Sequence, residues 1–98
     1  MSKLPTTPKD LSAAGKRLWR KILADWPIVD AAHLEILREA LLARDRAESC
    51  RRQINEVGEL VVDRFNQQKP NPLLPHERDA RSAFIQGIKA LGLDPSEV

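Results

Sequence analysis

Apolar residues recur every three or four positions over residues 13–26, which is the period of an amphipathic helix. The apolar stripe consists of Ala14, Leu18, Trp19, Ile22 and Leu23. Ser12 precedes it and has a side chain suited to capping the first turn. Pro27 ends it, because proline disfavours helical backbone at the residue before it. We therefore predict a first helix over residues 13–26.

Residues 31–57 contain neither proline nor glycine and follow Asp30, a second candidate N-cap, so we predict one helix over this whole range. Apolar residues at alternating spacings of four and three form a heptad row on it, which requires a partner helix. The heptad row consists of Ile36, Ala40, Ala43, Ala47, Cys50, Ile54 and Val57. A second row, made of Leu34, Leu37 and Leu41, faces elsewhere and is expected to pack on the first helix.

The remaining third of the chain predicts a short β-hairpin over about 60–69 and a third helix over about 75–91. The hairpin is indicated by β-branched residues after Gly58, and Phe65 near its turn either anchors it to the helices or projects towards a neighbour. Pro70-Asn71-Pro72 is interpreted as a stiff connector. In the third helix the apolar face consists of Ala80, Phe84, Ile88 and Leu91, with Pro75 at the first position and Gly92 at the end.

These elements predict a mainly all-α domain over residues 11–93, between a mobile tail at 1–10 and a short tail at 94–98. A chain of 98 residues fits one domain. No apolar run reaches the roughly 20 residues that a membrane span needs, and no signal peptide is recognisable. We therefore expect a cytoplasmic protein without membrane contact.

The inventory of reactive side chains offers no catalytic site. The phosphate-binding patterns GxxxxGK[ST] and GxGxxG are absent. His33 and His76 lie near the starts of different helices, and the single cysteine, Cys50, has no partner at metal-ligand spacing and is typical of a small buried hydrophobe. We expect no enzymatic activity, no cofactor and no metal.

Positive charge is concentrated at the start of the chain, where residues 1–26 hold six basic and two acidic residues. Four of the basic residues are spaced so that they stack along the first helix. This basic strip consists of Lys16, Arg17, Arg20 and Lys21. It suits the phosphates of DNA, bound by charge and with little sequence preference, although solvated helix faces often have the same pattern.

Other basic residues are weaker candidates for DNA contact. Arg64 and Lys69 could reach DNA from the hairpin. The remaining cluster consists of Arg44, Arg46, Arg51 and Arg52. Asp45 and Glu48 lie among these arginines and favour ion pairs on the helix surface or between subunits. Trp19 and Trp26 are more typical of a core than of base stacking.

The order of several segments along residues 11–93 resembles the small terminase subunits of tailed phages. The segments are Ala14-Gly15-Lys16-Arg17-Leu18-Trp19-Arg20-Lys21-Ile22-Leu23, Asp45-Arg46-Ala47, Gly58 with Asp63-Arg64-Phe65, and Pro70-Asn71-Pro72 with Glu77-Arg78-Asp79-Ala80-Arg81. The resemblance implies a homo-oligomeric ring that binds double-stranded viral DNA and recruits and regulates a large terminase subunit, which supplies ATPase and nuclease. In such a ring the heptad row is the expected contact between copies.

Two other functions fit the same residues. A helix-turn-helix regulator would use the first two helices across Pro27-Ile28-Val29 and would expose the second as a recognition helix. A structural adaptor would use the heptad row to bind another protein and leave the basic strip solvated.

Overall fold

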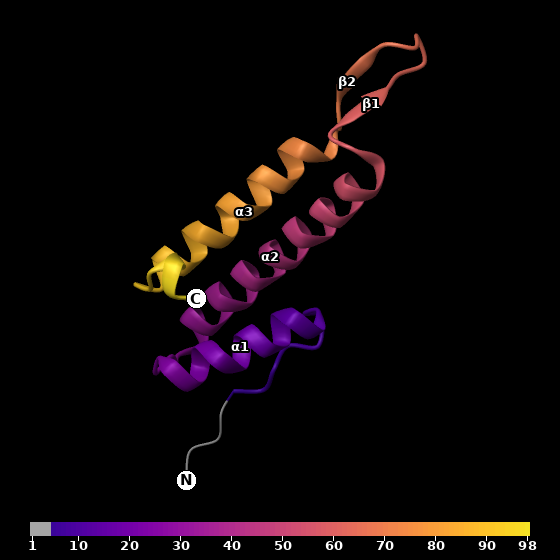
Figure 1. Cartoon of the computed structure of the whole chain (residues 1–98). Coiled ribbons are helices and arrows are strands. Elements are labelled where there is room, and N and C mark those ends of the chain that lie inside the picture. The colour runs from indigo at the N-terminus through magenta and orange to yellow at the C-terminus, as the bar shows by residue number, and fades with distance from the viewer. Residues whose placement is uncertain (1–4) are drawn as a thin grey trace.

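The computed structural model describes residues 5–98 and confirms a mainly helical fold (Figure 1). The helices are α1 (Ala13–Asp25), α2 (Ala31–Val57) and α3 (Leu73–Ala90). Between α2 and α3 lies an antiparallel hairpin of β1 (Leu60–Val62) and β2 (Gln68–Pro70), and a 3-10 turn, η1, covers Pro95–Glu97.

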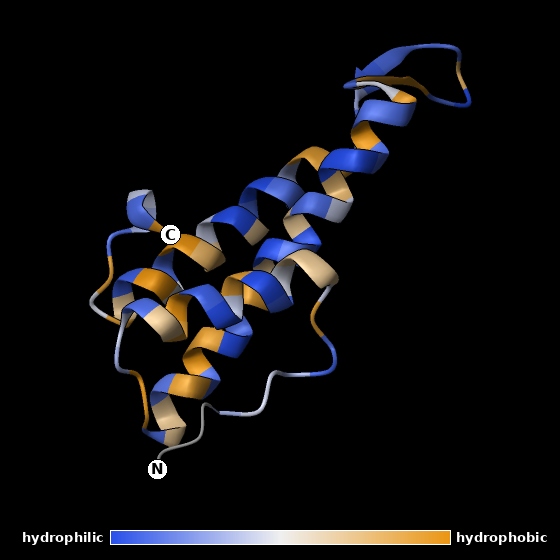
Figure 2. Cartoon of the chain, turned by 60° about the horizontal axis from the view of Figure 1, so that its bottom comes forward, coloured by the Kyte–Doolittle hydropathy of each residue, from blue (hydrophilic) through white to orange (hydrophobic). Residues whose placement is uncertain are grey.

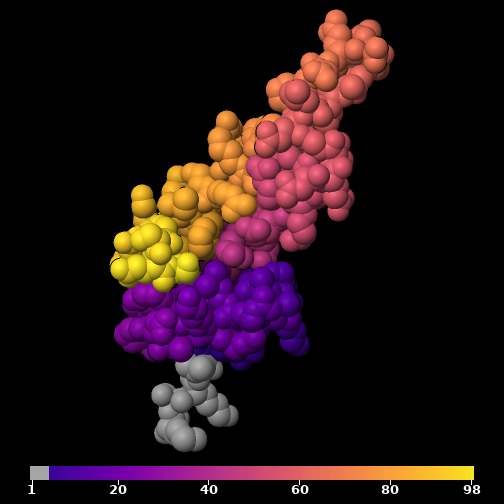
Figure 3. Space-filling model, in the orientation of Figure 1, coloured from indigo at the N-terminus to yellow at the C-terminus, as the bar shows by residue number. Residues whose placement is uncertain are grey.

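The molecule is elongated, measuring 63 × 23 × 20 Å (Figures 1 and 3). Helices α2 and α3 run side by side in opposite directions and form its long axis. The β-hairpin projects from one end of this pair, whereas α1 crosses the other end. Any function that involves both the hairpin and α1 must therefore act at two distant places.

The starts of the first two helices follow the predicted caps. The Ser12 hydroxyl accepts a hydrogen bond from the Gly15 amide at 3.0 Å, and the Asp30 carboxylate accepts one from the His33 amide at 3.1 Å. The predicted range of α2 is confirmed, and α1 ends one residue earlier than predicted. Trp26 has extended backbone, φ −130° and ψ 137°, because Pro27 follows it.

The predicted start of α3 at Pro75 is wrong, because the helix begins two residues earlier. The Asn71 side-chain oxygen accepts a hydrogen bond from the Leu73 amide at 3.0 Å and so initiates the helix. Pro75 still fits within the first turn, where the amides have no helical acceptor. Asn71 is buried and also donates to the Gly58 carbonyl at 2.9 Å. It therefore ties α3 to the end of α2 and closes the base of the hairpin.

The predicted tails need correction as well. Residues 94–98 do not form a tail, because η1 is capped by the Asp94 carboxylate and Val98 packs on the core. Gly92, at φ +78°, turns the chain back after α3, as expected. Of the predicted tail at 1–10, residues 1–4 lie outside the described residues. Asp10 at its other end forms an ion pair with Arg38 of α2.

The main core lies where α1 crosses α2. The second apolar row behaves as predicted, since Leu37 and Leu41 are fully buried together with Ile22. Trp19 is buried in this core, and Trp26 is partly buried and packs against the same cluster. Both tryptophans therefore belong to the core. Figure 2 shows the apolar positions of the helices alternating with polar ones.

The heptad row was predicted to form the contact between copies, but most of it lies in the interior of the chain. Its five central residues, Ala40, Ala43, Ala47, Cys50 and Ile54, are buried within the chain. Only the ends remain accessible, with Ile36 half-buried and Val57 67% exposed. Helix α3, which packs along α2, supplies the partner helix that the row requires. The assignment of Ala47, Cys50 and Ile54 to an intersubunit interface is therefore corrected, whereas Ala40 and Ala43 line a groove on the surface.

Gly87 allows this close packing of α3 on α2. A Cβ atom at Gly87 would lie 2.7 Å from the Cβ of Ala40, well inside van der Waals contact. We expect Gly87→Ala to lower the free energy of unfolding by about 1–3 kcal/mol, despite the better helix propensity of alanine, because the helices must separate. Urea denaturation measures this.

A double-mutant cycle with Ala40→Gly is the control. Removing the opposing methyl group should make Gly87→Ala markedly less costly than it is in the wild-type background. Equal costs in both backgrounds would show that contact with Ala40 is not the cause.

Candidate nucleic-acid interface

The basic strip lies on the outer surface of α1. Arg17, Arg20 and Lys21 are exposed and Lys16 is half-buried. None of the four forms an ion pair with a carboxylate within residues 5–98. The charge of the strip is therefore available to an external anion.

Part of the strip lines a groove between α1 and α2. Arg17 and Lys21 approach it from α1, and Arg44 approaches it from α2. The groove measures about 470 Å³, and Ala14 and Leu18 complete its lining, so no carboxylate takes part. We refer to these five residues as the basic groove. Three cations around an apolar floor are an arrangement whose charge is complementary to an anion such as phosphate.

Among the members of this groove, Arg44 was predicted to be a weaker candidate for DNA contact. Its neighbour Asp45 predicted a neutralising ion pair, but the Asp45 carboxylate instead accepts hydrogen bonds from the Ser12 amide at 2.7 Å and the Ser12 hydroxyl at 2.6 Å. Gly15 makes room for this contact, because a Cβ there would lie 2.9 Å from the carboxylate oxygens. Asp45 thus holds the start of α1 on α2, and Arg44 remains unpaired among the described residues.

The basic groove has a clear boundary. Past Ala14 it meets a smaller depression of about 160 Å³ that contains charges of both signs. The charged residues there are Arg44, Asp45, Glu48 and Arg52. The unbalanced positive surface therefore belongs to α1 and the facing side of Arg44, and it ends at this depression.

Elsewhere in residues 5–98, carboxylates are concentrated on a few arginines. Seven carboxylates pair with only four arginines. The carboxylates are those of Asp10, Glu35, Glu39, Glu48, Glu59, Glu77 and Asp79, and the arginines are Arg38, Arg51, Arg78 and Arg81. This unequal sharing leaves positive charge on α1 although the whole chain carries a net charge of only +2.

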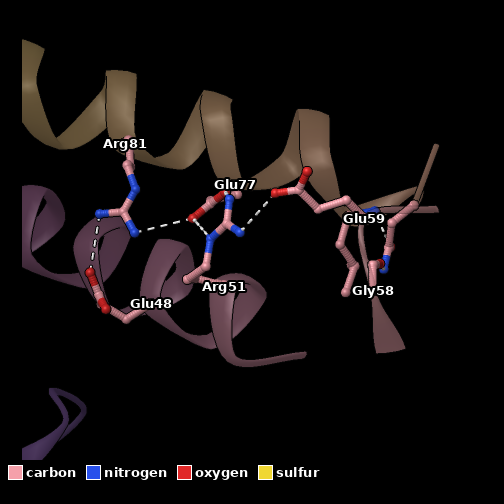
Figure 4. A network of polar contacts seen from close by, with 8 residues as sticks. Glu48, Arg51, Gly58, Glu59, Glu77 and Arg81 are labelled. Carbon is pink, nitrogen blue, oxygen red and sulfur yellow. Dashed lines mark hydrogen bonds and ion pairs between the residues drawn. The ribbon is translucent and has the colours of Figure 1, made fainter. Parts of the chain in front are cut away.

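Figure 4 shows the main ion-pair network, which joins α2 to α3. The Glu77 side chain is only 9% exposed and receives two hydrogen bonds from Arg51, at 2.8 and 2.5 Å. Arg81 donates to Glu77 and to Glu48, both at 3.1 Å. The hydrogen bond from Arg51, followed by that from Arg81, lowers the pKa of Glu77. Arg51 is therefore a structural residue and not a free cation.

The six predicted DNA-contacting residues do not form one surface. Arg64 and Lys69 are exposed on the β-hairpin, at the opposite end of the molecule from the basic groove (Figure 1). The Arg64 guanidinium lies over the ring of Phe65, 4.9 Å from its centre. The two basic regions therefore have different surroundings and require separate explanations.

Within residues 5–98, no three His, Cys, Asp or Glu side chains are grouped so that they could hold a metal ion. In the same part of the chain, no helix has the length and apolarity required to cross a membrane. No model of a known protein family, no curated protein and no solved structure matches the chain.

The lowered pKa of Glu77 makes stability depend on pH. A carboxylate whose pKa falls on folding stabilises the folded state above its ordinary pKa of 4.5, and this contribution is lost as the pH falls through the folded-state pKa. Glu77→Gln should therefore lower the free energy of unfolding at neutral pH and flatten its decline in acid. Chemical denaturation at a series of pH values measures both effects.

Glu56→Gln is the matched control, because Glu56 is exposed on α2 and has no ion pair among the described residues. It should follow the wild-type pH profile. If Glu77→Gln also follows that profile, Glu77 does not stabilise the fold as an ionised group.

Proposed function

We propose that this chain is a non-catalytic small terminase subunit of a tailed phage, which binds double-stranded viral DNA in the host cytoplasm and works as an oligomeric ring with a large terminase subunit. One observation carries the proposal of DNA binding. Arg17, Lys21 and Arg44 converge on one groove without a carboxylate, while much of the acidic charge of the chain is engaged elsewhere.

The basic groove suits the sugar–phosphate backbone better than base edges. Its charged groups are arginine and lysine side chains around apolar residues, and such side chains bind phosphates through charge. Three cations in one copy give weak binding. A ring would present the groove many times, so that simultaneous contacts raise the overall affinity steeply. Oligomerisation is thus part of the proposed mechanism.

The resemblance of the segment order to small terminase subunits supports the remaining parts of the proposal. Within it, the ring holds DNA and delivers it to the large subunit, which carries out ATP hydrolysis and cleavage. The residues quoted for the resemblance include structural contacts between helices, since Gly15 lies against Asp45 and Glu77 pairs with Arg51 of α2. The pattern therefore tracks how the helices are joined.

A helix-turn-helix regulator fits less well. Such a protein inserts its second helix into the major groove and so needs that helix exposed. Here α1 packs on α2 near its start, and α3 packs along it. Both neighbouring helices therefore cover parts of α2 that a recognition helix would have to present.

DNA binding through the basic groove predicts a specific salt dependence. The double variant Arg17→Gln and Lys21→Gln should weaken binding to duplex DNA and reduce the slope of log K against log salt by roughly 2 per subunit, because each lost phosphate contact contributes about 0.9. Arg44→Gln should reduce the slope by about half as much. Fluorescence anisotropy with a labelled duplex at several salt concentrations measures this.

The matched control is Arg78→Gln with Lys89→Gln, which removes two exposed charges of α3 outside the basic groove. This control should retain nearly the wild-type slope. Equal losses in both double variants would contradict the groove and indicate attraction by net charge alone. No binding of the wild-type protein to duplex DNA would favour the structural adaptor.

A further inference from the structure

The β-hairpin carries apolar side chains that remain exposed to solvent. Leu60 is 57%, Val62 60% and Phe65 68% exposed. Leu60 and Val62 are two residues apart on one strand and so lie on the same face. We call these three residues the apolar tip. A two-stranded hairpin alone is barely stable in water, and grouped apolar residues on a surface indicate a binding site for another protein.

A groove of complementary character lies between α2 and α3. It measures about 580 Å³ and has a predominantly apolar lining. Its floor consists of Ile36, Ala40, Ala43, Ala83 and Gly87, and its rim carries Ala32, Glu35, Glu39 and Arg46. The small side chains of the floor create the hollow, while two glutamates and one arginine provide charge on the rim. We call this surface the α2–α3 groove.

The apolar tip cannot fill the α2–α3 groove of its own chain. Ala40 lies in the groove and Val57 ends α2, and a helix of this length places the two about 25 Å apart along its axis. The hairpin continues beyond Val57 and points away from the groove end of the molecule (Figure 1). The apolar tip can therefore fill such a groove only on another molecule.

We propose that the apolar tip of one copy docks into the α2–α3 groove of a second copy. Arg64 accompanies Phe65 on the hairpin. Beside the groove, Glu35 and Glu39 share the single arginine Arg38 with Asp10, so this cluster keeps a net negative charge, which is complementary to Arg64. The tip supplies an aromatic and two aliphatic side chains, and the floor supplies small and aliphatic ones. Ile36, Ala40 and Ala43 of the heptad row line the groove, so this contact uses the first part of that row.

The geometry of this contact explains how a closed assembly forms. Tip and groove are different surfaces, so each copy uses its tip on one neighbour and its groove on another. Such a contact generates a ring when the rotation between neighbours closes. The inference rests on the oligomerisation in the proposed function, but it does not depend on DNA binding.

Complementation between two variants tests the contact. Phe65→Ser removes the centre of the tip and leaves the groove intact, whereas Ala83→Arg fills the groove from an exposed position of α3 and leaves the tip intact. Each variant alone should self-associate about tenfold or more weakly than the wild type. An equimolar mixture should form a one-to-one dimer, because one good tip and one good groove remain. Light scattering over a concentration series without DNA measures the masses.

Val29→Ser is the matched control, since Val29 is 80% exposed and belongs to neither surface, and it should assemble like the wild type. Circular dichroism checks that each variant retains its helices. If Phe65→Ser does not fold, Val62→Lys replaces it as the tip variant.

Three results would overturn the contact: a wild-type protein that stays monomeric at all concentrations, full assembly of both variants, or failure of the mixture to form dimers. Full assembly of both variants with DNA binding lost only in the α1 variants would leave the proposed function in place. Self-association that depends on the tip and the groove, without any binding of DNA, would support the contact and contradict the proposed DNA binding. Loss of DNA binding in Phe65→Ser without loss of self-association would assign the hairpin to DNA instead.

Discussion

The close packing of α3 along α2 is the interaction on which the rest of the structure depends. Ala40 and Gly87 face each other so closely that one added methyl group would collide, and further along the pair Arg51 and Arg81 bind the nearly buried Glu77. Packing and ion pairs thus act at different positions of the same helix pair. Together they fix an elongated molecule with two functionally distinct ends.

The same packing explains why much of the heptad row, which resembles an oligomer interface, is buried within the chain. A heptad row needs a partner helix, and in this chain α3 supplies it. Covering the row with α3 leaves other surfaces for partners: the hollow beside Gly87 and the hairpin that connects the two helices. Both surfaces result from the antiparallel packing of α3 along α2, which forms the groove and requires the connecting hairpin.

The ion pairs are distributed unevenly over the molecule. Arg51 and Arg81 gather carboxylates at the junction of α2 and α3, and Asp45 is engaged by Ser12. Among the described residues, no carboxylate forms an ion pair with the basic strip of α1, and Arg44 joins Arg17 and Lys21 across the groove. A chain with a small net charge obtains a basic surface on α1 in this way.

The sequence alone determined the elements whose limits depend on neighbouring residues. The caps at Ser12 and Asp30 and the full length of α2 follow from local hydrogen bonding and the absence of proline and glycine. Tertiary structure decided the start of α3, where Asn71 reaches back to the end of α2, and the role of Arg44, which depends on where α1 crosses. It also decided what covers the heptad row. Periodicity shows that one side of a helix is apolar, but the surface that covers it is selected by the packing of the whole chain.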